Sequence, residues 1–324
     1  MYIFFNIYIT LISLWFIGAI FTVHLKKKKF FNLLSVSTGL AFLVNAAYLL
    51  NFSKIAISKP FFDNRLFNAI GFITFIVILI SIFSLLNIKR KALNTLWIYL
   101  KRFLVISLIV SVIIPIFISK LGDDYVSNRA NELKNQSIAY ELVAKQTINN
   151  DIWQVGQSLL SSIHSTIFDI STDISTGIIH GIVIFLLLYI ISITFFKYIT
   201  SGKFFKILSY LALVGLFLSL FLSITMALSL ILLAISILLI LYCEYINILK
   251  SKLEKNIHIE ELLIALFLVL IASISSIVFK LILLGIAIGG LYFFVNKKRT
   301  EALLFIRPLL FAILINPVIL GLVF

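Results

Sequence analysis

Apolar runs of about 20 residues, separated by short clusters of lysine and arginine, dominate this sequence. A helix of about 20 residues crosses the ~30 Å hydrocarbon core of a bilayer, so each long run predicts a spanning helix. Ten spans are predicted, over residues 2–25, 30–51, 67–88, 103–119, 178–197, 207–225, 227–248, 260–278, 281–296 and 302–324. Around Lys280, where two short runs meet, a re-entrant segment is the alternative to two crossings.

The bulk composition agrees with this pattern. The chain has 324 residues, of which 62% are hydrophobic and 12% charged, and its mean hydropathy is +1.16. Average soluble domains have roughly 45–50% apolar and about 25% charged residues, so a water-soluble fold of this length is excluded. The predicted class is an all-α polytopic integral membrane protein with about ten transmembrane helices.

The distribution of charge predicts the topology. The formal net charge of +14 arises from 27 lysines and arginines against 13 acidic residues. In the ten-helix topology, eighteen of these basic residues fall in loops on one side, for example Lys26 to Lys29 and Lys297 to Arg299. Basic residues concentrate in cytoplasmic loops, which predicts a multi-pass protein of a bacterial cytoplasmic (inner) membrane with both termini extracytoplasmic. An organellar membrane is the alternative location.

Several functional classes are not expected from these residues. The basic clusters are separated by spans and cannot form one groove, so nucleic-acid binding is not expected. The single cysteine, Cys243, excludes an intramolecular disulfide and a cysteine-cluster metal site. Neither an H-E-x-x-H motif nor a G-x-S-x-G motif is present, and no pair of acids is expected inside the spans. We therefore expect no catalytic residues, no metal and no cofactor.

Residues 120–177 have a different composition, with seven of the thirteen acidic residues of the chain. A stripe of apolar residues at steps of three or four predicts a helix, as in Val155, Leu159, Ile163, Ile167, Ile170, Ile174 and Ile178. A second helix is predicted before it, and the turn residues Ile148 to Asp151 separate the two. The segment is expected to be an extracytoplasmic helical hairpin, with arms of about 25 residues, between spans four and five.

This hairpin divides the chain into an N-terminal membrane bundle (1–119), the hairpin (120–177) and a C-terminal membrane bundle (178–324). Two interpretations of the hairpin are open. Its apolar stripes pack on each other and make a structural cap, or residual apolar positions bind a protein partner or a second copy of the chain. The lipid bilayer is the other expected partner.

Ionisable residues inside spans are functional candidates because they are costly in lipid. Arg307 lies five residues into the last predicted span, and Glu244 lies near the inner end of span seven. Both are about 8 Å from the inner boundary, so an ion pair between them is predicted. The alternative is that each side chain reaches interfacial water separately.

Amide and proline residues add weaker candidates for a transport path. Asn45 and Asn316 are polar residues inside predicted spans. Pro115, Pro308 and Pro317 are predicted to kink their helices, because proline lacks the backbone N–H and leaves a carbonyl free. Freed carbonyls line solute paths in transporters, although proline kinks also serve packing alone.

Gly285 and Gly289 form a small-xxx-small step that predicts close packing on a neighbouring helix. Together these features predict a transporter, permease or channel subunit of unknown substrate. The alternative is a membrane-embedded scaffold subunit of a larger export, envelope-assembly or defence complex, which docks partners through the 120–177 hairpin.

Overall fold

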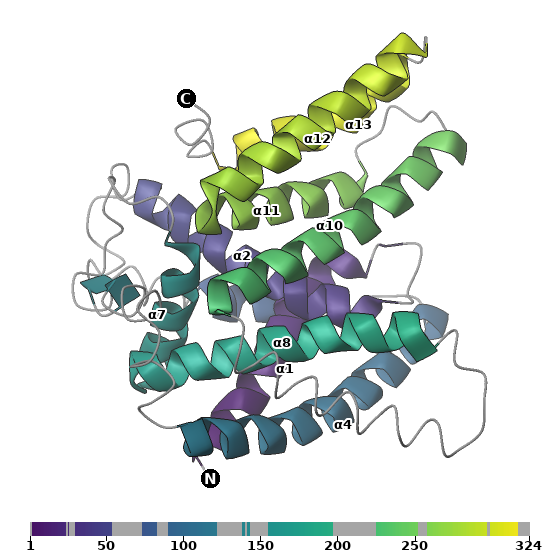
Figure 1. Ribbon diagram of the computed structural model, residues 1–324. Coiled ribbons are helices and arrows are strands. Elements are labelled where there is room, and N and C mark those ends of the chain that lie inside the picture. Colours follow the sequence, from purple (N-terminus) through teal and green to yellow (C-terminus); the bar gives the residue numbers. More distant parts are fainter. Residues whose placement is uncertain are drawn as a thin grey trace.

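The secondary structure is α-helical throughout the part of the chain that the computed structural model describes (Figure 1). The described residues are 2–23, 25, 30–53, 73–82, 90–121, 138–139, 141–142, 155–196, 225–251, 258–296 and 299–316. The helices are α1 (Tyr2–Thr22), α2 (Phe31–Ser53), α4 (Arg90–Leu121), α7 (Gly156–Phe168), α8 (Thr172–Phe196), α10 (Met226–Ser251), α11 (Ile259–Ile274), α12 (Ser276–Val295) and α13 (Arg299–Ile315). A shorter helix covers Ile73–Ile82.

Six of the described helices are long and apolar enough to cross a membrane. The six segments are Tyr2–Thr22, Phe31–Leu49, Trp97–Pro115, Thr172–Ser192, Met226–Ile246 and Ser276–Val295. They agree with the expectation of a helical membrane protein. The number of ten spans stays a prediction, because residues 67–72, 83–88 and 207–224 lie outside the described residues and α11 and α13 are shorter apolar helices.

The closest helix pair is α1 with α2, which run antiparallel. A Cβ atom on Gly18 would overlap the carbonyl oxygen of Ser35, and one on Gly39 would overlap the carbonyl oxygen of Leu14. The two backbones therefore touch at two points, which only glycine allows. The Oγ1 of Thr22 and the Oγ of Ser35 share a hydrogen bond of 2.7 Å across the same interface.

Aromatic packing joins α4 to this pair. The Trp15 ring is buried on α1 and stacks on Phe103 of α4, with 5.9 Å between ring centroids. Trp15 Nε1 donates a hydrogen bond to Asn32 Oδ1 at 2.9 Å, and Asn32 Nδ2 donates to the Tyr99 carbonyl at 3.2 Å. Three helices are thus connected through one indole and one carboxamide.

The centre of the bundle is α11, which packs against α2, α7, α10, α12 and α13 (Figure 1). Every residue from 263 to 273 is buried. A helix that is apolar on all sides is covered either by other elements or by lipid. The composition of α11 is compatible with its buried place, and at 16 residues it is shorter than a typical span.

At the edge of the bundle, α12 packs on α13 and leaves most of its own surface exposed. Gly289 faces the Phe305 ring and Gly290 faces Ile306, whereas a Cβ on Gly285 would meet open space. The contact between these two helices is therefore made at Gly289 and Gly290, and Gly285 lies on the exposed side of α12.

Two helix boundaries differ from the expected ones. The break between α11 and α12 falls at Ser275, whose Oγ accepts a hydrogen bond from the Val278 backbone N–H and caps α12. Lys280 consequently lies inside α12, exposed, and not in a loop. The second difference concerns the fourth predicted span, which was expected to begin at residue 103. The helix α4 already begins at Arg90, and it carries Lys101 and Arg102, both exposed, on its surface.

The second arm of the expected hairpin is broken in two. Asp169 adopts a left-handed conformation (φ 49°, ψ 51°) that ends α7, and α8 starts three residues later. The helix α7 folds back onto α8 and also contacts α2, α10 and α11. The expectation of one unbroken helix from 151 into the fifth span is therefore wrong, while most of the first arm lies outside the described residues.

The α1–α2 contact gives a prediction about stability. Gly18→Ala and Gly39→Ala should each lower the free energy of unfolding by about 1–3 kcal/mol, because the added methyl group overlaps the backbone of the other helix. Gly285→Ala is the matched control, and it should raise stability by up to about 1 kcal/mol through helix propensity alone. Unfolding in detergent micelles measures all three; equal effects would contradict the close contact.

Candidate functional site

Arg307 and Glu261 form a bidentate ion pair between α13 and α11. Arg307 Nε donates a hydrogen bond to Glu261 Oε2 at 2.7 Å, and Nη2 donates to Oε1. The Glu261 side chain is fully buried, and the Arg307 side chain keeps 20% of its surface exposed. Two parallel N–H···O bonds fix the relative orientation of a guanidinium and a carboxylate, so this pair locks the two helices together.

A third helix contributes to the same place. Tyr245 of α10 is fully buried and interacts with both Glu261 and Arg307. Glu261 lies in the first turn of α11, where the partial positive charge of the helix end favours a carboxylate. We call Tyr245, Glu261 and Arg307 the Arg307 centre. It is a charged, hydrogen-bonded cluster at the junction of three largely apolar helices.

Sequence reasoning predicted Arg307 but missed Glu261. Glu260 and Glu261 are both buried in the first turn of α11, so the expectation of no acid pair inside the spans is wrong. They stand at the edge of the predicted span, where charges are ordinarily assigned to the interface. Glu244 is half-buried on α10, directly before Tyr245. Its pairing with Arg307 stays a prediction.

The amide candidates occupy separate positions. Asn45 is buried on α2, and its Nδ2 donates to the carbonyls of Ala41 at 2.7 Å and Leu266 at 3.3 Å. It therefore ties α2 to α11. Asn316 is buried at the end of α13, where its backbone N–H donates to the Ala312 carbonyl at 3.0 Å.

Of the three prolines that were predicted to kink helices, Pro115 lies inside α4 and Pro308 lies inside α13, directly after Arg307. Pro317 falls outside the described residues. Pro308 is buried. Because proline has no backbone N–H, the helix turn that carries Arg307 includes a residue that cannot donate a backbone hydrogen bond.

A second polar site lies on α7, which sequence reasoning had placed outside the membrane bundle. All residues from Gly156 to Ser165 are buried, and they include four serines, Gln157 and His164. A Cβ on Gly156 would overlap the Ser273 hydroxyl, so the start of α7 abuts the end of α11. Thr176 Oγ1 of α8 donates to Ser161 Oγ at 3.0 Å, and Ser162 Oγ donates to the Ala139 carbonyl at 3.0 Å.

His164 is the most strongly constrained residue of α7. Its Nε2 lies 2.9 Å from Thr10 Oγ1, and its Nδ1 lies 2.7 Å from Ser175 Oγ. The Thr10 hydroxyl hydrogen is directed to the Asn6 carbonyl at 2.7 Å, so Thr10 accepts from His164 Nε2–H. Nδ1 is then an acceptor and Ser175 donates to it. These bonds select the neutral Nε2–H tautomer.

Burial lowers the pKa of His164 to about 3, well below its ordinary value of 6.5. The ring therefore stays neutral at physiological pH. It serves as a fixed hydrogen-bonding link from α7 to α1 and α8.

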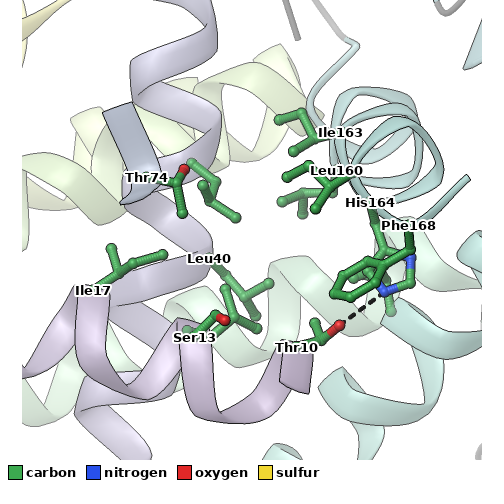
Figure 2. Close-up of a pocket in the computed structure, with 13 residues that line it drawn as sticks. Thr10, Ser13, Ile17, Leu40, Thr74, Leu160, Ile163, His164 and Phe168 are labelled. Carbon is green, nitrogen blue, oxygen red and sulfur yellow. Dashed lines mark hydrogen bonds between the residues drawn. The ribbon is translucent and has the colours of Figure 1, made fainter. Parts of the chain in front are cut away.

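Beside this ring lies a cavity of about 70 Å³, which we call the His164 cavity (Figure 2). Thr10, Ser13, Thr74 and His164 are its polar residues, and Thr74 lies across the cavity from Thr10 and His164. The buried Thr74 Oγ1 has no partner among the described residues. The volume exceeds the roughly 10–15 Å³ that one water molecule requires, so the cavity can hold ordered water beside this hydroxyl.

The pKa of His164 gives a prediction about pH dependence. The unfolded state binds a proton below pH 6.5 while the folded state stays neutral down to about pH 3. The contribution of His164 to stability is therefore complete above pH 6.5 and falls as the pH decreases below it. Between pH 8 and pH 5 the free energy of unfolding should decrease by about 2 kcal/mol from this residue.

The control is His164→Gln, which keeps hydrogen-bonding capacity and removes the titration. Its unfolding midpoint in detergent should vary less with pH than that of the unsubstituted chain. Parallel pH profiles of the two proteins would show that His164 titrates normally in the folded state.

No protein-family model, no curated protein and no solved structure matches the chain. Its function therefore has to be argued from its own residues.

Proposed function

We propose that the chain is a multi-pass membrane transporter, permease or channel subunit, and that the Arg307 centre is the part of it on which transport depends. The single observation that carries this proposal is the bidentate Arg307–Glu261 pair at the junction of apolar helices. Ionisable groups at such positions most often mark solute, ion or proton paths.

Energetics favour a functional over a purely structural role for this pair. Removing two charges from water costs as much as their attraction returns, so a buried pair contributes little net stability compared with apolar residues of similar volume. Apolar side chains of similar volume would also join α11 and α13, and both helices already contribute such residues to the core. A charged pair in this place is therefore best explained by what it binds or releases.

Contacts between helix ends agree with the alternation of sides in the proposed topology, whereas the orientation with both termini extracytoplasmic rests on the distribution of basic residues alone. The Tyr2 hydroxyl donates to the Phe168 carbonyl at 2.5 Å, which joins the expected outer ends of the first span and of α7. The Arg307 centre joins the expected inner ends of α10 and α11. Helix ends assigned to the same side by the positive-inside rule thus lie together.

The scaffold function remains the second candidate, with docking through residues 120–177. The described part of the second arm packs inside the bundle, and a docking surface would have to lie in residues 122–154, most of which the structure does not describe. Transport would require the charges of the Arg307 centre, whereas partner binding through residues 122–154 would not. The two functions therefore predict different results for variants of this centre.

The test is the double variant Glu261→Met/Arg307→Met, compared with the single variant Glu261→Gln. The double variant should keep its stability within about 2 kcal/mol, because two apolar side chains replace a buried pair, whereas the single variant should lose about 3–5 kcal/mol. Cells with and without the chain are compared by mass spectrometry of internal solutes to find the transported compound.

Uptake of that compound by the double variant should fall to the level of cells without the chain, although the protein is folded and present in the membrane. Undiminished uptake would contradict the role given to the Arg307 centre. Absence of any solute difference, together with a protein complex that co-purifies with both the wild-type chain and the double variant, would favour the scaffold function.

A further inference from the structure

A second and larger cavity, of about 330 Å³, lies between α1, α2, the Ile73–Ile82 helix, α11 and α13. We call it the Asn45 cavity, after its single polar lining residue. Its other walls are apolar, and the Phe21 and Phe42 rings, 5.8 Å apart between centroids, form one of them. The volume falls within the range of roughly 300–1,000 Å³ that is typical of ligand pockets.

The chemistry of the walls restricts what can occupy the cavity. None of its described lining residues is charged. Both hydrogens of the Asn45 amide point to carbonyls, at Ala41 and Leu266, so Asn45 offers no donor to a phosphate or carboxylate. Its remaining polar atom, Oδ1, is an acceptor without a partner among the described residues, and an acceptor does not bind an anion. An anionic headgroup would be left without a hydrogen-bonding partner at these walls, which is costly in an apolar environment. A hydrocarbon chain needs none.

The location of the cavity indicates the source of that hydrocarbon. Two of its walls, α1 and α2, are long and apolar enough to cross a membrane. At its rim, the apolar side chain of Leu49 is 42% exposed, so the cavity reaches the surface of the bundle. Around a spanning helix that surface meets lipid tails. If the Asn45 cavity were empty, its apolar walls would also lack the dispersion contacts that an acyl chain inside it would supply.

We infer that the Asn45 cavity is a binding site for one acyl chain of a membrane lipid, which enters past Leu49 with its headgroup outside. This site differs from the Arg307 centre, and its occupation does not depend on the proposed transport function. It also differs from the lipid-facing surface of α12, which is exposed along its whole length and encloses nothing.

The experiment uses a phospholipid that carries a diazirine in one acyl chain. This lipid is mixed at low proportion into liposomes that contain the full-length protein. After photolysis, peptide mapping should find label at Phe42, Leu49 and Leu266. Ala46→Phe, which fills the hollow, should reduce labelling at these positions roughly tenfold, equivalent to a loss of about 1.4 kcal/mol in binding free energy. Leu284→Phe on the exposed face of α12 is the matched control and should leave this labelling unchanged.

Because Ala46 is buried, its variant can fail to fold, and Leu49→Trp at the rim is the second variant. It should reduce labelling at Phe42 and Leu266 by closing the entrance. Equal labelling per residue in the cavity and on α12, unaffected by either folded variant, would overturn the inference and identify ordinary lipid contact. Neither result depends on solute uptake.

Discussion

The hydrogen-bonding requirement of polar groups in lipid contributes to which helices meet in this protein. Hydrocarbon offers no hydrogen-bonding partner, so a polar side chain on a spanning helix is stabilised where another part of the chain shares its hydrogen bond. Asn32 connects Trp15 to the α4 backbone, Asn45 connects α2 to α11, and Arg307 connects α13 to α11. The apolar surface supplies contact area, and these few polar groups add directional contacts between particular helices.

The same requirement explains why α7 lies inside the bundle. Four serines, a glutamine and a histidine would be satisfied by water on an exposed arm, but its apolar positions Leu159, Leu160 and Ile163 would then lack cover. Folding back at Asp169 buries those positions while Thr10, Ser175 and Thr176 satisfy polar ones. The result is a short polar helix enclosed by the ends of longer apolar helices, which joins segments far apart in the sequence.

The apolar runs predicted the helical membrane class and most of the described helices, because run length and charge are local properties. The partners of those helices depend on contacts between distant residues. Arg307 was recognisable as a charge inside a run, but Glu261 stands at a helix start, where a carboxylate is ordinary. Gly285 and Gly289 formed a motif, yet the closest backbone contact among the described helices uses Gly18 and Gly39, which stand in the small-xxx-small steps Gly18–Thr22 and Ser35–Gly39. The break at Asp169 was hidden because the apolar stripe continues across it.

Cysteine labelling is the sharpest test of whether α7 packs between the ends of the spanning helices that the proposed topology assigns to the outer side. In a Cys243→Ala background, single cysteines are placed at exposed Asp169, buried Leu160 and exposed Lys101, and intact cells are treated with a membrane-impermeant maleimide. We expect labelling at position 169 in intact cells, labelling at 101 only after permeabilisation, and labelling at 160 only after denaturation. Labelling at 160 in intact cells, or at 101 without permeabilisation, would contradict this arrangement.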